Sequence, residues 1–489
     1  MADKDYRIYA RIKTIEFINF RNIEYGKVDF PNARIEDFKC GSPSILGLYG
    51  QNGSGKTSLI MALSILKDLL SGHSIENNYL SSVRVGCDFA RLRFVITLFD
   101  DFGVEYEAHY QFDLKTEVEN YSLDDNEFNI DPPQDKSETL KVYNEILRYR
   151  RTTANGTEDP LQDIIDASVD SSQKAGYSFG NKSKYELLIG KDKEVEQKMR
   201  DAKAASYAKS RSFIFSKDVY TSINTNESIA HYKELIAALH TFGMAYLHII
   251  NTMNTGINNL KNDIPLCIWS DKNGSLRIAY VLLKTMGANQ VPEDFYSFVT
   301  EAINGLSGVL GTIVPGLSIE IKDNGLASNE KNETVHVFEI VSNRNGVSIP
   351  LKYESDGIRR IVSILSLLIA VYNQPSMTIA IDEMDSGIFE YLLGEILQVL
   401  SESARGQLVF SSHNLRPLEV LPAKFLCFTT VNANNRFIKM PDVSANNNLR
   451  DKYFRNIILG ETEELYAPTD KYDIELAFYQ AGNDLDTKG

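Results

Sequence analysis

Residues 50–57, with the sequence GQNGSGKT, constrain this chain more than any other segment. They follow an apolar run, residues 44–49, and precede residues 57–70, which carry good helix formers without Gly or Pro. A G-x-x-x-x-G-K-T pattern between a strand and a helix is typical of a phosphate-binding loop, because its glycines let backbone N–H groups point at phosphate oxygens. The pattern predicts an α/β fold of the P-loop type.

The residue types within this loop predict its ligands. Lys56 is expected to reach the β- and γ-phosphates of a nucleotide, and the Thr57 hydroxyl is expected to ligate Mg²⁺. ATP and Mg²⁺ are therefore the expected cofactors. Further nucleotide contacts are expected from the loop residues Asn52, Gly53, Ser54, Gly55 and Ser58.

A pair of carboxylates lies far along the chain, in the sequence TIAIDE of residues 378–383. Asp382 is expected to hold Mg²⁺ directly or through water. Glu383 is expected to orient or deprotonate the attacking water, because phosphoryl transfer depends mainly on positioning and charge neutralisation. An apolar run followed by Asp-Glu is common in proteins, and its pairing with the P-loop favours catalysis over an ordinary strand end.

Three weaker signals accompany the carboxylates. Ser355 and Gly357, in YESDGIRRI, precede a helical pattern, and a Ser-x-Gly at a helix N-terminus can offer N–H groups to a γ-phosphate. Asp385 lies just past the carboxylate pair, and His413 ends the run LVFSSH. A histidine at a strand end can sense the same phosphate, although a lone histidine is more often packed or exposed without a function.

Six segments of the sequence carry a resemblance to a known family: IEFINFRNI, GQNGSGKTS, ESDGIRR, IAIDEMDSGIF, FSSHN and NNLRDKYFRNIILG. In their order, these segments resemble the ABC ATPases of the SMC and RecF kind, and specifically the bacterial AAA-type, OLD-like ATPases of phage-defence systems. The resemblance implies catalytic roles for Lys56, Glu383 and His413. It also implies a homodimer or higher homo-oligomer, in which the P-loop of one subunit and Ser355 and Gly357 of another enclose each ATP.

The sequence departs from this pattern at several points. The segment of residues 355–357, which we call the signature, reads Ser-Asp-Gly instead of the Ser-Gly-Gly of transporters. The interval between Lys56 and Asp382 is also much longer than in transporter subunits. Gln111 is a candidate for the glutamine that such ATPases place near the nucleotide. Arg21 is either a nucleotide contact or an exposed arginine at a strand end.

The pattern along the chain predicts a mixed sheet with an antiparallel lobe and an inserted helical region. Apolar and polar residues alternate in residues 90–98 and 104–112, which predicts an antiparallel hairpin. We expect an N-terminal ATPase lobe in residues 1–115, an insertion in residues 116–310 and a C-terminal ATPase lobe in residues 311–489. Helices are expected at residues 140–151, 192–212 and 228–260, and later strands at residues 317–321, 335–342, 347–351, 377–381 and 407–410.

Composition limits the surroundings and the partners. Lys and Arg number 51 against 66 Asp and Glu, and the net charge of −15 repels phosphate backbones. Non-specific DNA binding is therefore not expected from the net charge, although a local basic channel is compatible with it. Four scattered cysteines suggest neither a disulfide framework nor a zinc site. No apolar run approaches the ~20 residues that span a bilayer, so we expect a cytoplasmic protein without a membrane partner.

Three functions are compatible with these motifs. The resemblance favours an ATPase that senses a phage-derived trigger and regulates a separate nuclease effector, Toprim-like or HNH, because the stretch after His413 is too short to hold a nuclease domain as well. The alternative is a RecF-like ATPase of DNA repair or recombination, whose hydrolysis would be stimulated by duplex DNA. A transporter ATPase subunit is disfavoured by the long insertion and by the Ser-Asp-Gly signature.

Overall fold

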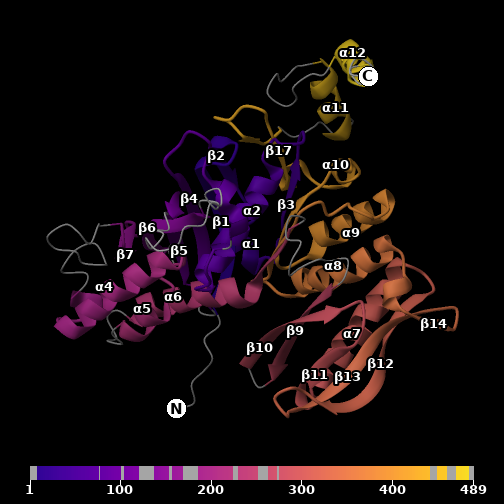
Figure 1. The fold of residues 1–489 in the computed structure, drawn as a ribbon, viewed down its shortest axis with the longest axis horizontal. Helices are drawn as coiled ribbons and strands as arrows, with labels where there is room; N and C mark the ends of the chain where they lie inside the picture. Colours follow the sequence, from indigo (N-terminus) through magenta and orange to yellow (C-terminus); the bar gives the residue numbers. More distant parts are fainter. Residues whose placement is uncertain are drawn as a thin grey trace, which may run out of the picture.

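The computed structural model of this protein shows two large β-sheets that enclose a helix (Figure 1). A smaller lobe of strands and one helix, α7, lies at the lower right of the figure. None of the helices in the part of the chain that is described is both long and apolar enough to cross a membrane. The structure describes residues 8–75, 77–100, 104–119, 137–152, 157–168, 186–223, 230–251, 263–272, 275–440, 449–459 and 470–483.

The first sheet is antiparallel, with the strand order β2-β1-β4-β5-β6-β7. The predicted hairpin is confirmed as β4 and β5, in which Phe94 pairs with Tyr110; its turn, residues 101–103, lies outside the described residues. The strands are β1 (Ile8–Phe20), β2 (Ile23–Asp29), β4 (Ala90–Asp100), β5 (Glu105–Glu119), β6 (Ser137–Thr152) and β7 (Gln162–Asp166).

The helix predicted at residues 140–151 is wrong, because these residues belong to strand β6. The register between β5 and β6 shifts near Tyr143, and Asn144 has a positive φ of 52°. This bulge breaks the two-residue alternation of buried side chains, which resumes at Leu147 and Tyr149. A broken alternation imitates helical spacing in the sequence.

The second sheet is mainly parallel, with the order β18-β17-β3-β16-β15-β8. The P-loop strand, β3, is therefore flanked by β16 and β17, which come from the far end of the chain. The predicted buried strands before the carboxylates and before His413 are confirmed as β15 and β16. The strands are β3 (Ser44–Tyr49), β8 (Leu247–Ile250), β15 (Thr378–Ile381), β16 (Gln407–Ser411), β17 (Leu426–Thr429) and β18 (Phe437–Ile438).

The single long helix predicted for residues 228–260 is also wrong. Helix α6 (Ala230–Thr241) passes into a π-helical turn, and strand β8 then pairs with β15. An apolar run as short as residues 247–250 suits a strand as well as a helix, and the free edge of β15 decides between them. Residues 252–262 lie outside the described part of the chain. The charged helix predicted at residues 192–212 is confirmed as α4 (Lys193–Ala208).

Helix α2 (Lys56–Leu70) fills the space between the two sheets. Its side chains share one core with the inner face of the antiparallel sheet and with one face of the parallel sheet, including Leu46, Ala380 and Val409. Helices α8 and α9 cover the opposite face of the parallel sheet, and α7 packs against α8 from the smaller lobe. Their bounds are α7 (Glu293–Ile313), α8 (Asp356–Asn373) and α9 (Glu390–Ser403).

One buried side chain joins the two sheets. The amide of Gln407 accepts a hydrogen bond from the N–H of Ile12 at 2.7 Å and donates one to the carbonyl of Ile12 at 2.9 Å. Ile12 lies at a register shift between β1 and β4. The Gln407 amide therefore pairs with the N–H and carbonyl of Ile12 at a point where the ladder is irregular, and it fixes β1 beside β16.

The remaining elements lie at the edges of the molecule. Strands β12, β13 and β14 confirm the sheet predicted for residues 317–351.

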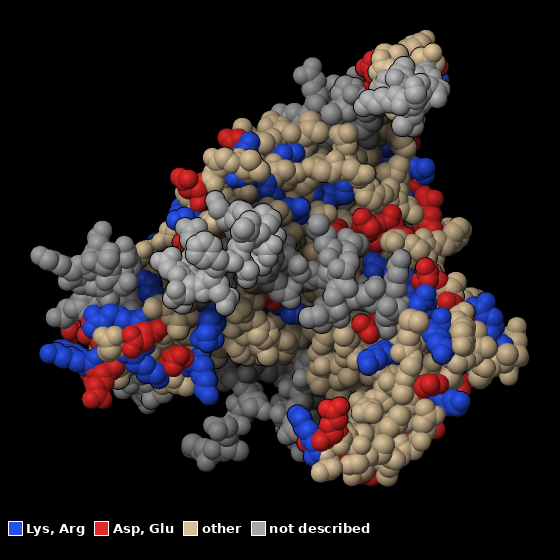
Figure 2. Space-filling view, viewed as in Figure 1, with Lys and Arg blue, Asp and Glu red and all other residues tan. Residues whose placement is uncertain are grey.

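Lys and Arg are mixed with Asp and Glu around α4 and α5 at the lower left of Figure 2. The division of the chain at residues 115 and 310 stays a prediction. The other elements are α1 (Ile35–Lys39), α5 (Lys217–Ser222), β9 (Asp263–Lys272), β10 (Ser275–Lys284), β11 (Asn289–Pro292), β12 (Leu317–Ser328), β13 (Thr334–Arg344), β14 (Val347–Pro350), α10 (Pro417–Val420), α11 (Leu449–Leu459) and α12 (Lys471–Asn483).

Candidate functional site

A cavity of about 860 Å³ opens where the P-loop meets the ends of β15 and β16. It brings together segments that lie far apart in the sequence: the turn after β1, the P-loop, the strand-end carboxylates and His413 just after β16. Its lining residues are Arg21, Asn22, Asn52, Gly53, Gly55, Lys56, Thr57, Ser58, Ser81, Val83, Arg84, Val85, Asp382, Glu383, Ser411 and His413.

The P-loop owes its shape to tight packing. A Cβ at Gly50 would lie 2.0 Å from Thr429 Oγ1 on β17, so only glycine fits there. Lys56 opens helix α2, and its Nζ donates to the carbonyls of Gly50 at 2.7 Å and Gln51 at 3.1 Å. Burial lowers the pKa of Lys56, and the nearby Asp382 and other carboxylates oppose this effect. The ammonium group is thus held inside a fold of the loop, facing negative charge.

The two carboxylates are positioned by a serine that the sequence analysis did not single out. The hydroxyl of Ser411, at the end of β16, donates to Asp382 Oδ1 at 2.5 Å and accepts from the N–H of Glu383 at 2.8 Å. Asp382 is buried, and Glu383 adopts a left-handed backbone conformation with φ of 49°. Such a conformation is uncommon for a residue other than glycine, and it turns the chain sharply after the strand.

The arginine Arg360 supports the same turn from helix α8. Its Nη2 donates to the carbonyls of Asp382 and Glu383, each at 3.3 Å. Burial lowers the pKa of Arg360, and the carboxylate of Glu383 is the largest opposing influence. The only signal for this contact in the sequence is the RR of ESDGIRR, which does not reveal its partner.

Asp385 and His413 form a linked pair of turns. The carboxylate of Asp385 accepts hydrogen bonds from the backbone N–H of His413 at 3.1 Å and of Asn414 at 3.0 Å. His413 lines the cavity, whereas Asp385 is not among the described lining residues. Asp385 therefore holds the histidine loop in place in this structure instead of facing the cavity.

Ser355 and Gly357 lie away from this cavity. Neither residue is among the described residues that line it, and neither is hydrogen-bonded to one of them. The Ser355 side chain caps helix α8 by accepting from the N–H of Ile358 at 3.3 Å. Gly357 packs on the turn after the carboxylates, where a Cβ would lie 2.5 Å from the carbonyl oxygen of Gly387. Ser355 is exposed, so the N-terminus of α8 faces solvent.

The sequence leaves open where Arg21 and Gln111 lie relative to the nucleotide. Arg21 lines the cavity; burial lowers its pKa, and Asp382 opposes this. Gln111 lies instead on the outer face of the antiparallel sheet, where it accepts a hydrogen bond from Arg93 Nε at 2.7 Å. The structure thus brings Arg21 to the cavity and leaves Gln111 outside it.

The donor set fits a magnesium–nucleotide complex. The described residues contain no group of three or more His, Cys, Asp or Glu side chains able to hold a metal. Mg²⁺ rarely needs such a cage, because it retains waters and binds one or two carboxylates together with substrate phosphates. Asp382 and Thr57 line the cavity and suit this role, and the cavity volume lies within the range of ligand pockets.

A P-loop that faces two strand-end carboxylates across a nucleotide-sized cavity defines the class of P-loop NTPases. Residues 11–416 match the family model described as AAA ATPase domain, and the chain belongs to this family. The comparison with curated proteins gives no match.

Several solved structures are similar to this chain at low identity. An Smc head domain from Pyrococcus furiosus, bound to the C-terminal domain of ScpA, shares 11% identity with a TM-score of 0.38, over 93% of this chain and 100% of that one. The SMC head domain from Thermotoga maritima shares 12% identity with a TM-score of 0.34, over 88% and 99%. A structure of the recombination mediator protein RecF shares 14% identity with a TM-score of 0.36, over 88% and 99%.

Proposed function

We propose that this protein binds ATP with Mg²⁺ in the cavity at the P-loop and hydrolyses it to ADP and phosphate. The observation that carries the proposal is the convergence of Lys56, Thr57, Asp382, Glu383 and His413 on one cavity from three separate parts of the chain. Membership of the AAA ATPase domain family supports the same activity.

Each residue has a role that its position supports. Lys56 and the backbone N–H groups of the loop neutralise the phosphates, while Thr57 and Asp382 would hold Mg²⁺. Glu383 orients the attacking water and accepts its proton. Bound Mg²⁺ would supply charge neutralisation on the phosphate oxygens.

We further propose that two copies of the chain complete each site. The exposed N-terminus of α8, with Ser355 and Gly357, lies outside the chain's own cavity and is available to the cavity of a second copy. A helix N-terminus carries partial positive charge that favours a phosphate. His413 and Arg21 are the further groups of the cavity that we assign to the γ-phosphate side.

Substitution of the two central residues tests the hydrolytic role. Glu383→Gln removes the water-orienting carboxylate but leaves Lys56 and Asp382, so we expect ATP affinity to stay near that of the wild type while turnover falls by about 10²-fold or more. Lys56→Ala should instead weaken ATP binding itself. Calorimetric titration with ATP and a phosphate-release assay separate the two effects, and a Glu383→Gln protein with wild-type turnover would remove Glu383 from the mechanism.

The biological role that we favour is regulation of a separate nuclease effector in anti-phage defence. Its support is the resemblance of the six sequence segments to the ATPases of such systems. The RecF-like role in DNA repair is the alternative, and duplex DNA distinguishes the two. We expect the ATP turnover of the purified chain to stay within about twofold when duplex DNA is added, because the net charge of −15 opposes binding to a phosphate backbone. A strong, salt-sensitive stimulation would favour the RecF-like role.

A further inference from the structure

A second cavity, of about 530 Å³, lies at the other end of helix α2. Helix α2 has 15 residues, which places this cavity about 22 Å from the P-loop along the helix axis. We call it the Arg211 pocket. Its lining residues are Ser71, Gly72, Arg211, Phe215, Ser216, Lys217, Tyr220, Ile236, Ala237, His240 and Thr241.

Two polar groups in the Arg211 pocket are buried without a partner. Arg211 Nε and Ser71 Oγ have no hydrogen-bond partner among the described residues, and Ser71 is only 7% exposed. An unsatisfied buried donor costs roughly 1–3 kcal/mol, and more when it is charged. A ligand that accepts a hydrogen bond from either group would remove the cost of that group.

The charge of the pocket favours an anion. Arg211 and Lys217 are cationic, and the described lining residues include no Asp or Glu. Three carbonyls in the last turn of α2, those of Lys67, Asp68 and Leu69, already accept hydrogen bonds from the N–H groups of Ser71, His73 and Gly72. These three carbonyls are therefore capped. A guanidinium group binds phosphate through two parallel hydrogen bonds, which suits a phosphate ester.

The lining of the pocket also includes apolar and aromatic side chains. Phe215 and Ile236 are buried at 4% and 1% exposure, while the Tyr220 ring is 42% exposed and carries the ammonium of Lys233 at 4.9 Å from its centroid. Aromatic walls of this kind bind flat rings by stacking. The volume of the pocket is within the range of small-molecule sites.

We propose that the Arg211 pocket binds a small phosphate ester that carries a planar ring, of the mononucleotide class, with its phosphate on Arg211 and its ring against Tyr220. The site is distinct from the P-loop cavity, with which it shares no lining residue. It does not depend on whether the protein hydrolyses ATP.

The test is calorimetric titration of the full chain with AMP in the Lys56→Ala background, which weakens the P-loop cavity. We expect AMP to bind with one site per chain, and Arg211→Gln in the same background to weaken this binding at least about tenfold, which corresponds to roughly 1.4 kcal/mol. Ser71→Ala, which removes one small donor, should weaken it less. Inorganic phosphate should compete weakly, because it lacks the ring.

Arg200→Gln is the matched control. Arg200 lines a neighbouring cavity that Arg211 also borders, but it is not among the described residues of the Arg211 pocket. Its substitution should leave AMP affinity unchanged, and ATP binding by the single Arg211→Gln variant reports that this protein is folded. The proposal is overturned if AMP does not bind the folded Lys56→Ala protein at millimolar concentration, if Arg211→Gln and Ser71→Ala leave the affinity unchanged, or if Arg200→Gln weakens it as much as Arg211→Gln does.

Discussion

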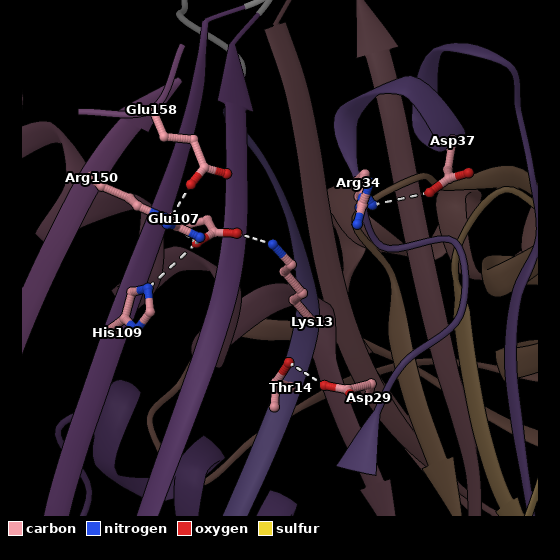
Figure 3. Close-up of polar contacts among 9 residues, drawn as sticks. All are labelled: Lys13, Thr14, Asp29, Arg34, Asp37, Glu107, His109, Arg150 and Glu158. Carbon is pink, nitrogen blue, oxygen red and sulfur yellow. Dashed lines mark hydrogen bonds and ion pairs between the residues drawn. The ribbon is translucent and has the colours of Figure 1, made fainter. Parts of the chain in front are cut away.

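At the scale of single residues, a buried carboxylate ties three strands of the antiparallel sheet together (Figure 3). Glu107 on β5 is 3% exposed and accepts from Lys13 on β1 and from Arg150 Nε on β6, the latter at 2.5 Å, with His109 Nε2 at 3.4 Å. Burial alone would raise the pKa of Glu107, but its contacts with His109, Lys13 and Arg150 outweigh this effect and lower the pKa to about 2.

This lowered pKa makes the stabilisation by Glu107 depend on pH. The folded-state value lies below the ordinary value of 4.5, so the contribution is fully present above about pH 4.5 and is lost as the pH falls towards 2. We expect Glu107→Gln to reduce the free energy of unfolding by about 3 kcal/mol at pH 7 and by clearly less at pH 3.5. Urea denaturation of both proteins at the two pH values measures this.

A matched control comes from the same cluster. Glu158 also pairs with Arg150, at 2.5 Å, but its side chain is 50% exposed. Glu158→Gln should therefore cost less than about 1 kcal/mol at either pH. Equal losses for the two variants, or a loss at Glu107 that does not change with pH, would contradict the assignment of the low pKa to buried contacts.

At the scale of elements, the sequence predicted what local pattern alone determines. Strand β3, helix α2 and the hairpin of β4 and β5 follow from runs of residues whose spacing matches their structure. Strand β6 was mistaken for a helix because a bulge interrupts its alternation, and β8 because only its place beside β15 makes it a strand. Long-range contacts of this kind leave no local signal.

The same limit applies to the candidate site. The P-loop residues and the Asp382–Glu383 pair are recognisable because their chemistry needs a fixed local spacing. Ser411 and Arg360 act on that pair from other elements. Their contacts exist only after β15, β16 and α8 have packed, so no spacing in the sequence predicts them.

At the scale of the whole molecule, our proposal that two copies share each site predicts complementation between variants. Lys56→Ala damages the P-loop but keeps the signature, and Ser355→Arg blocks the signature but keeps the P-loop. Each variant alone should be nearly inactive. A one-to-one mixture with free exchange should recover roughly a quarter of wild-type turnover, because half of the dimers are mixed and each mixed dimer holds one intact site of two.

A phosphate-release assay on the mixture measures the recovery, and labelled subunits show whether exchange has occurred. Ser328→Arg, at an exposed position at the end of β12, controls for the added arginine and should remain active. Exchange without any recovery of turnover would mean that each chain completes its own site.

Because β3 lies between β16 and β17, the sheet around the P-loop can form only after most of the chain has been synthesised. The P-loop strand is made early, but both of its neighbours belong to residues 407–429 and are made late. Until then both edges of β3 lack their partners, and an open strand edge invites pairing with other chains. A truncated product that ends before residue 407 therefore carries the whole P-loop without the sheet that supports it. We therefore expect a chain that ends before residue 407 to lack the proposed ATPase activity and to be prone to aggregation.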